Sequence, residues 1–272
     1  MRKLALSDEI LLKVDKAARY IGGEVNSVMK DKNEVEIRFA MCFPDVYEIG
    51  MSNLGMMILY NMFNQREDVW CERVYSPWVD LDKVMREEHI PLFALESQDP
   101  VKEFDFLGIT IQYEMCYTNI LQVLDLSGIP LKSADRGEDF PIVIGGGACA
   151  YNPEPLAPFF DLFYIGEGET VYDALFDAYK ANKKAGGSRR DFLLAAAKIP
   201  GIYVPSLYEV TYKEDGTIAS FAPTEAGVPE KVQKQLIIDM EKEYRAVEAP
   251  VVPHIKATQD RVTLEIQRGC IR

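Results

Sequence analysis

The stretch EVEIRFAMCFPDVYEIGMSNLGMMILYNMFNQ, residues 34–65, reads as a strand, a short loop and a helix in succession. Its first part is rich in β-branched and aromatic residues, as strands are, and it ends at Pro44. Apolar residues at helical spacing follow, and Ser52 or Asn53 stands where a helix N-cap is needed. The stretch therefore predicts one complete strand–helix unit.

The same alternation of strand and helix recurs about six times along the chain. The further predicted strands are 71–78, 91–97, 105–114, 140–148 and 161–168, and the further predicted helices are 79–89, 116–128 and 169–186. The strands are apolar throughout, which is typical of strands covered on both faces. This pattern predicts an α/β fold with a doubly wound, mostly parallel sheet.

The two ends of the chain depart from this pattern. Ser7 can cap an N-terminal helix over residues 8–20, and residues 199–223 predict a β-hairpin that turns at Glu-Asp-Gly. A proline-containing linker follows, and RVTLEIQRGC begins a new strand. The predicted organisation is an α/β domain at 1–227, a linker at 228–260 and the start of another domain at 261–272.

The composition is that of a globular protein with a strongly acidic surface. The chain has 272 residues, 48% of them hydrophobic, and a net charge of −13. Such an anionic body disfavours binding to nucleic acid. No apolar run reaches the length of a membrane span, and no signal peptide can be recognised. We therefore expect a cytoplasmic protein.

The cysteines and histidines do not make a complete metal site. The chain has five cysteines, none in C-x-x-C spacing, and two histidines. This pattern fits neither a disulfide framework nor a whole zinc or iron site. We expect Cys42, Cys116 and Cys149 to be buried structural thiols.

In a doubly wound sheet, ligands bind beyond the carboxyl ends of the strands, so the loops there are the candidate sites. The first such loop, after the strand that ends at Pro44, carries Asp45, Tyr47, Gly50, Ser52 and Asn53. Glycines and free amides at a helix start suit phosphate or amide groups. A well-capped helix would explain the Ser and Asn equally well.

A second candidate loop follows the apolar strand GIT, where Thr110 and Gln112 could both hydrogen-bond a ligand. A third contains the glycine run Gly145, Gly146 and Gly147, which would let a planar or phosphorylated ligand lie against bare backbone. The run formally matches G-x-G-x-x-A, but prolines follow it instead of a helix. A nicotinamide dinucleotide site is therefore the less favoured reading.

The fourth loop is IGEGE at 165–169, with Gly166, Glu167 and Gly168 at its centre. The glycines allow a tight exit from the strand. The acidic residues lie where they would complement the dipole of the next helix, which is a sufficient explanation for them.

Taken together, these loops resemble the cobalamin-binding domain, which reads D-x-H-x-x-G, then S-x-L, then G-G. Asp45 and Gly50 match the first motif, Thr110 replaces the serine, and Gly145 and Gly146 match the glycine pair. The resemblance implies a cobalamin-binding-like Rossmann domain. One departure concerns the cobalt ligand, because Tyr47 takes the place of the histidine. A phenol with a pKa near ~10 is a poor cobalt ligand, so any cobalamin would bind without a histidine from this loop.

The last residues, TLEIQRGCIR, resemble the first barrel strand of a radical S-adenosylmethionine (SAM) enzyme, which runs into C-x-x-x-C-x-x-C. The resemblance makes Cys270 the first of three cysteines that hold a [4Fe–4S] cluster, with the chain ending inside the motif. It implies a parent enzyme in which the reduced cluster cleaves SAM to a 5′-deoxyadenosyl radical, and in which a cobalamin could carry a methyl group.

We therefore expect the accessory domain of a radical SAM enzyme of an incompletely characterised group, inactive by itself. Its partners would be small-molecule cofactors and the rest of the barrel, with neither nucleic acid nor membrane. The alternatives are a cofactor-free α/β scaffold and, less favoured, a Rossmann-type nucleotide-binding enzyme.

Overall fold

The fold is built on one six-stranded sheet in the order β2-β1-β3-β4-β5-β6. The computed structural model describes residues 4–243 and 247–269. The strands are β1 Ile37–Phe43, β2 Val69–Tyr75, β3 Phe106–Thr110, β4 Ile142–Gly146, β5 Leu162–Tyr164 and β6 Ile202–Tyr203. The first five are parallel and β6 runs antiparallel to β5. The predicted mostly parallel sheet is confirmed.

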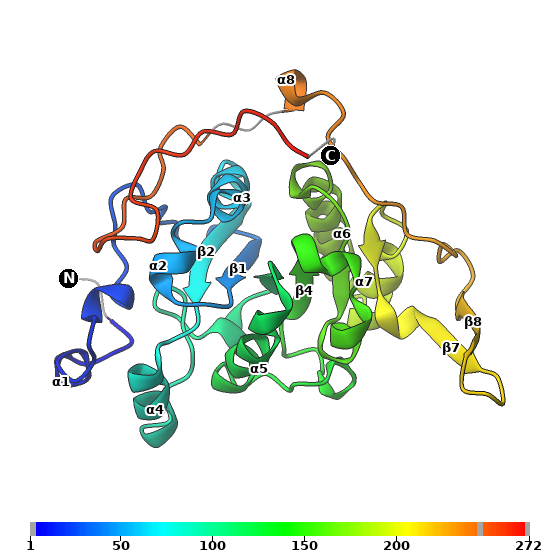
Figure 1. Cartoon of the computed structure of the whole chain (residues 1–272), viewed down its shortest axis with the longest axis horizontal. Helices are drawn as coiled ribbons and strands as arrows, with labels where there is room; N and C mark the ends of the chain where they lie inside the picture. Colours follow the sequence, from blue (N-terminus) through cyan, green and yellow to red (C-terminus); the bar gives the residue numbers. More distant parts are fainter. Residues whose placement is uncertain (1–3, 244–246, 270–272) are drawn as a thin grey trace.

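Helices cover both faces of the sheet, so the predicted double winding is confirmed as well (Figure 1). On one face lie α3 Leu54–Asn64, α6 Tyr172–Ala185 and α7 Arg189–Ala196, and on the other lie α4 Val79–Glu87 and α5 Tyr117–Leu126. Alternate residues of β1 enter the two cores: Phe39 and Met41 pack toward α3 and α6, while Ala40 and Cys42 pack toward α5. Burial on both faces explains the unbroken apolar strands.

Local sequence sets the helix ends. Asn53 is the N-cap of α3, with its side-chain oxygen accepting from the Met56 amide at 2.9 Å. Helix α6 ends at Gly186, which adopts the left-handed conformation. Ser188 and Asp191 form a capping box at the start of α7, a helix that we did not predict from the sequence.

The predicted N-terminal helix over 8–20 is wrong in extent. Ser7 does cap a helix, but α1 covers only Asp8–Leu11, and a 3₁₀ turn, η1, follows at Ala17–Arg19. Val14 and Tyr20 both enter the core beneath α4 and α5. Six residues apart, they would point to different sides of a continuous helix, so the chain turns between them.

The predicted strand at 91–97 does not form either, apart from an isolated bridge between Phe93 and Pro100. The reason is a buried carboxylate. Glu96 accepts from the backbone amide of Arg73 at 2.7 Å and from its Nε at 2.6 Å. These two bonds tie the Glu96 side chain to Arg73 inside the protein. They direct the 91–97 segment toward the core, so its backbone does not pair as a further strand of the sheet.

Arg73 is the centre of a charged network inside the protein. Its side chain is fully buried, as are those of its partners Glu24 and Glu96. The Arg73 Nη2 atom lies 2.8 Å from Glu24, and the phenols of Tyr47 and Tyr60 donate to Glu24 and Glu96. The network joins the N-terminal segment to β2 and the 91–97 segment.

Beyond the sheet, β7 Tyr208–Tyr212 and β8 Ile218–Pro223 form the predicted hairpin, which extends away from the domain (Figure 1). The short helix α8 Met240–Glu243 follows. Residues 261–269, predicted as the start of a barrel strand, are not paired into a sheet within the described part of the chain. A strand needs a neighbouring strand for its hydrogen bonds, and none lies beside this segment there.

Candidate functional site

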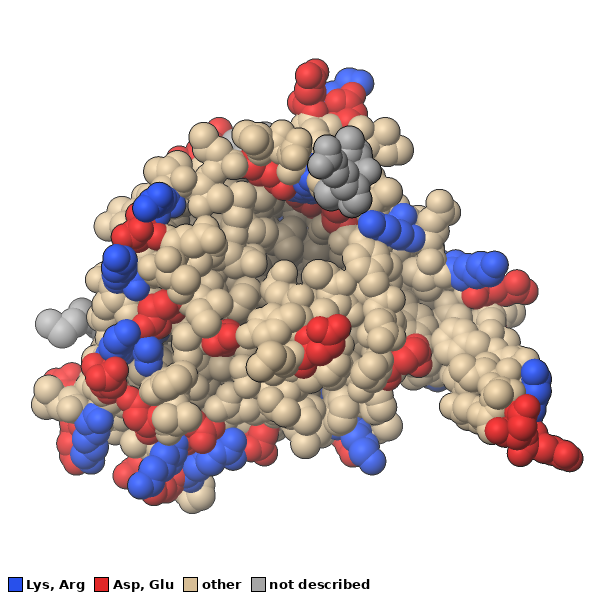
Figure 2. Space-filling view, in the orientation of Figure 1, with Lys and Arg blue, Asp and Glu red and all other residues tan. Residues whose placement is uncertain are grey.

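A cavity of about 300 Å³ opens between α3 and the loop after β5, above the carboxyl-terminal halves of β1, β3 and β4. Strand β2 lies on one side of β1 and β3 on the other, so the strand order reverses here. This switch point is where open α/β sheets bind ligands. The hollow is visible in Figure 2 beneath the C-terminal segment.

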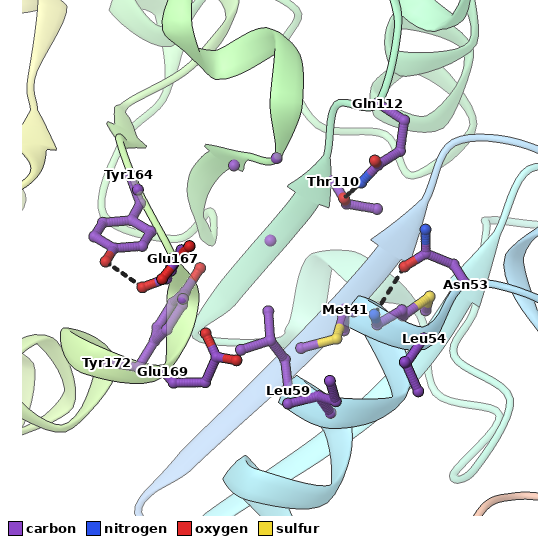
Figure 3. A pocket seen from close by; sticks show the side chains of 18 of the residues that line it. Met41, Asn53, Leu54, Leu59, Thr110, Gln112, Tyr164, Glu167, Glu169 and Tyr172 are labelled. Atoms are coloured by element: carbon purple, nitrogen blue, oxygen red, sulfur yellow. Dashed lines mark hydrogen bonds between the residues drawn. The ribbon is translucent and has the colours of Figure 1, made fainter. Parts of the chain in front are cut away.

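The floor of the cavity is apolar. Phe39 and Met41 of β1 and Ile144 of β4 contribute side chains, and Leu59 and Tyr172 approach from the helices (Figure 3). Hydrophobic walls with few polar groups are typical of small-molecule sites.

Gly108 in the middle of β3 is part of this floor. A Cβ atom built on it would lie 2.4 Å from the Phe39 ring. The glycine is therefore required for the Phe39 ring to lie across the sheet. A glycine inside an apolar strand is the sequence signal that could have identified this close approach.

Two of the predicted loops supply a polar rim (Figure 3). Thr110 and Gln112 line the cavity after β3, with the Gln112 amide donating to the Thr110 hydroxyl at 2.5 Å. Asn53 lines it from the start of α3. The structure thus brings the first and second predicted loops together at one rim, although only Asn53 of the first loop reaches it.

The glycine run divides between two environments. Gly146 and Gly147 line the cavity, whereas Gly145 does not. A Cβ atom on Gly145 would lie 2.5 Å from the Phe163 ring, but one on Gly146 would meet no atom within 4 Å. Gly147 has a φ angle of 96°, and a Cβ there would lie 2.9 Å from the Ile111 carbonyl oxygen. Backbone at Gly146 is thus open to a ligand.

The predicted IGEGE loop forms the acidic wall. Gly166, Glu167 and Gly168 all line the cavity, together with Glu169. Gly166 lies so close to the following segment that a Cβ would be 2.4 Å from the Gln235 carbonyl oxygen. The Glu167 carboxylate accepts from the Ile237 amide at 2.6 Å. The loop is therefore held by backbone of the linker as well as by its own turn.

Tyr164 and Arg268 complete this wall. The Tyr164 hydroxyl donates to the Glu167 carbonyl oxygen at 2.5 Å, and burial raises the pKa of Tyr164 to about 12. The Arg268 guanidinium donates to Glu169 and, at 2.6 Å, to Glu265. We did not identify Arg268 from the sequence, because nothing near it in the chain indicates that it contacts the IGEGE loop.

Four predicted residues of the first loop lie outside the cavity lining: Asp45, Tyr47, Gly50 and Ser52. Asp45 lies in the turn before α2 Tyr47–Gly50, Tyr47 and Gly50 lie within it, and Ser52 lies just after it. A Cβ on Gly50 would lie 2.2 Å from the Tyr75 ring. Asp45 accepts from the Val46 amide at 2.7 Å, and Ser52 donates to the Glu48 carbonyl oxygen at 2.8 Å. These contacts are internal to the fold.

Tyr47 is directed into the core, where it is 1% exposed. Its hydroxyl donates to Glu24 at 2.9 Å, and burial together with that carboxylate raises its pKa far above the usual value. Tyr47 thus stays a neutral hydrogen-bond donor within the Arg73 network. Cys270, the predicted cluster ligand, lies outside the described residues.

Glu48 anchors the same loop to the N-terminal segment. Its carboxylate accepts from Arg19 and Lys16, each at 2.9 Å. Burial opposes its ionisation, but the two cations outweigh that effect and lower its pKa from 4.5 to about 2. Such a depressed pKa stabilises the fold above pH ~4.5, and this contribution is lost as the pH falls through about 2.

We therefore expect Glu48→Gln to lower the free energy of unfolding by roughly 2–3 kcal/mol at pH 7. Urea denaturation at pH 7, 4 and 3 should show this difference shrinking below pH 4.5. Glu87→Gln, which removes an exposed carboxylate 3.8 Å from Lys83, is the control and should change stability by less than about 0.5 kcal/mol. A Glu48 effect that is constant down to pH 3 would contradict this role.

Within residues 4–243 and 247–269, no helix is both long and apolar enough to cross a membrane. No group of three or more His, Cys, Asp or Glu side chains there is placed to hold a metal ion.

Parts of the chain are similar to known proteins. The chain is 28% identical over 131 residues to the uncharacterized protein MJ0966 of Methanocaldococcus jannaschii, a match covering 48% of this chain and 24% of that protein. The match thus spans about a quarter of that curated relative's length. The structure of the radical S-adenosylmethionine methyltransferase TsrM from Kitasatospora setae aligns with 66% of this chain and 29% of its own, at 12% identity and a TM-score of 0.36.

A family model described as radical SAM proteins, N-terminal, matches residues 55–205, more than half of the chain. The matched range runs from α3 through β6 and includes Thr110, Gly146 and the IGEGE loop. The chain belongs to this family of N-terminal domains of radical SAM proteins.

Proposed function

We propose that this chain is the accessory domain of a radical SAM enzyme and that its cavity holds part of a cobalamin. The observation that carries the proposal is the cavity itself. It lies at the switch in strand order of a radical SAM N-terminal domain, with an apolar floor and open glycine backbone at Gly146. The transfer of a methyl group by the whole enzyme is part of the same proposal.

The size and chemistry of the cavity can be compared with the cofactor. At about 300 Å³ it is at the lower end of ligand pockets, so it suits a flat heterocycle better than a whole corrin ring. The nucleotide base of a cobalamin would be the part that the cavity holds. Thr110 and Gln112 would supply hydrogen-bonding groups for it at the rim. The residues therefore fit part of the cofactor.

The described part of the chain places no histidine on the cavity wall. His254 instead lies 3.1 Å from the Gly22 carbonyl oxygen. The Tyr47 hydroxyl donates to the Glu24 carboxylate. A cobalamin held here would therefore bind without a protein imidazole on cobalt from these residues.

The segment before Cys270 supports the second half of the proposal. Val262, Leu264 and Ile266 alternate along it and are 86%, 76% and 89% exposed. Large, exposed apolar residues at every second position of an unpaired segment are typical of a strand that pairs into a sheet. We propose that this sheet is the radical SAM barrel and that Cys270 is a cluster ligand. When bound, the cluster would supply the electron that cleaves SAM.

The first experiment is a titration of the chain with hydroxocobalamin, followed by visible absorbance. We expect saturable binding at one site, and no binding of NADH, because the only cation on the wall, Arg268, is already paired with carboxylates in the described structure. Binding of NADH alone would favour the nucleotide-binding alternative. Absence of both would favour a cofactor-free scaffold.

The test of the cluster uses the whole radical SAM enzyme of which we propose that this chain is the accessory domain. We expect iron and sulfide, added without oxygen, to give a visible iron–sulfur absorption that Cys270→Ser abolishes. Cys149→Ser, which changes another free thiol, should leave that absorption intact. Equal spectra for Cys270→Ser and the unchanged protein would contradict the assignment.

A further inference from the structure

The segment that leads to Cys270 runs from the neighbourhood of α2 to the acidic wall of the cavity. We call residues 256–269 the strap. At one end the Thr258 amide donates to the Glu48 carbonyl oxygen at 3.1 Å, and the Gln259 amide donates to the Ser52 hydroxyl at 2.9 Å. At the other end Arg268 meets the IGEGE loop. In Figure 1 the strap starts on the side of α2, passes above α3 and ends near α6.

Between these two ends the strap has few ties to the domain. Val262, Leu264 and Ile266 are largely exposed, and residues 261–269 have no strand partner in the described structure. Placement of the strap's second half therefore depends on the side chain of Arg268.

Arg268 is held by three carboxylates. It donates to Glu169, and to both oxygens of Glu265 at 2.6 and 2.8 Å, and it lies 3.7 Å from Glu167. The Glu169 side chain is 7% exposed and that of Arg268 20%. An ion pair with so little solvent is stronger than a surface pair, and removing the cation would leave Glu169 poorly solvated.

All four of these charged side chains belong to the strap end or to the IGEGE loop, and Arg268, Glu265, Glu167 and Glu169 all line the cavity. Whatever fills the cavity therefore lies against the same guanidinium that fixes the strap. Arg268 is also two residues before Cys270 in the chain. One side chain thus connects the ligand site with the start of the proposed cluster loop.

We propose that Arg268 is a positioning residue that couples occupancy of the cavity to the placement of the Cys270 loop. The inference rests on the proposed function. With the strap docked, the cavity wall is complete, so a ligand that touches it favours the docked state. By linkage, docking must then strengthen ligand binding by the same factor.

The test compares backbone hydrogen exchange and ligand affinity in the same samples. Exchange over residues 262–268 is measured without ligand and with hydroxocobalamin. In the unchanged chain we expect ligand to slow exchange in the strap. In Arg268→Gln we expect fast exchange in both conditions and about 5- to 150-fold weaker hydroxocobalamin binding, the usual range for coupled sites.

Two further variants separate coupling from simple loss of charge. Glu169→Gln removes the partner on the IGEGE loop and should reproduce the effects of Arg268→Gln on both exchange and affinity. Lys256→Gln removes another cation of the strap, 3.6 Å from Asp260, and should leave both unchanged. Arg268→Lys should restore part of the protection, because it keeps the charge but not the forked geometry.

The outcomes distinguish the two proposals. If the unchanged chain does not bind hydroxocobalamin, the proposed function and the coupling both fail. If it binds and Arg268→Gln binds equally well, only the coupling fails. If hydroxocobalamin slows strap exchange in Arg268→Gln as much as in the unchanged chain, Arg268 does not couple the strap to the cavity, and the inference is overturned as well.

Discussion

Arg73→Met should lower the free energy of unfolding by about 3–5 kcal/mol, the usual cost of removing one partner from a buried ion pair. The substitution would leave the carboxylates of Glu24 and Glu96 inside the core without a cation. The phenols of Tyr47 and Tyr60 would remain as donors, but they do not neutralise charge. Urea denaturation followed by circular dichroism would measure the loss.

A matched control is available on the surface. Arg86 also pairs with two carboxylates, Asp82 and Asp125, but its side chain is 47% exposed. Arg86→Met should therefore cost no more than about 1 kcal/mol. Combining Arg73→Met with Glu24→Gln and Glu96→Gln should recover part of the lost stability, because it removes the unpaired charges. Equal effects of Arg73→Met and Arg86→Met would argue against a buried network.

The second large effect concerns the cavity. Gly146→Leu should weaken hydroxocobalamin binding by at least about 100-fold, since overlap with the ligand need cost only about 2.8 kcal/mol for that factor. The side chain would grow from the last residue of β4 into space where a Cβ meets no atom within 4 Å. The backbone there does not have a positive φ angle, so the fold should tolerate the change. Isothermal titration and thermal unfolding would measure the two quantities.

Gly137→Leu is the corresponding control. Gly137 is exposed, has no positive φ angle and also has no atom within 4 Å of a built Cβ, but it is not part of the cavity lining. We expect both leucine variants to keep the unfolding temperature of the unchanged chain within a few degrees. Ligand binding to Gly146→Leu with unchanged affinity would place the cofactor elsewhere.

The sheet and most of its helices could be predicted because local signals agree with the fold. Continuous apolar runs such as β3 and β4 are typical of strands covered on both faces, and Asn53 caps α3 through a contact three residues away. The 91–97 segment could not be predicted in this way. Its conformation depends on Glu96 meeting Arg73, and nothing within the segment reveals that partner.

The same distinction applies to the candidate site. Thr110, Gly146 and the IGEGE loop follow strands directly, so the strand direction alone brings them to the cavity. Tyr47 has the correct spacing for a ligand loop, but its direction is set by Glu24, 23 residues earlier. The apolar floor carries no polar residue that would identify it in the sequence. Gly108, a glycine inside an apolar strand, was the one sequence signal for it.

The sheet separates two cores, and this has a practical consequence for handling the protein. Most of the buried side chains that line the cavity belong to the core beneath α3 and α6, while α4 and α5 pack into the other. Exposed positions on α4 and α5 are therefore suitable for attaching fluorophores or surface tethers. A label there would report on the protein without obstructing ligand binding to the cavity.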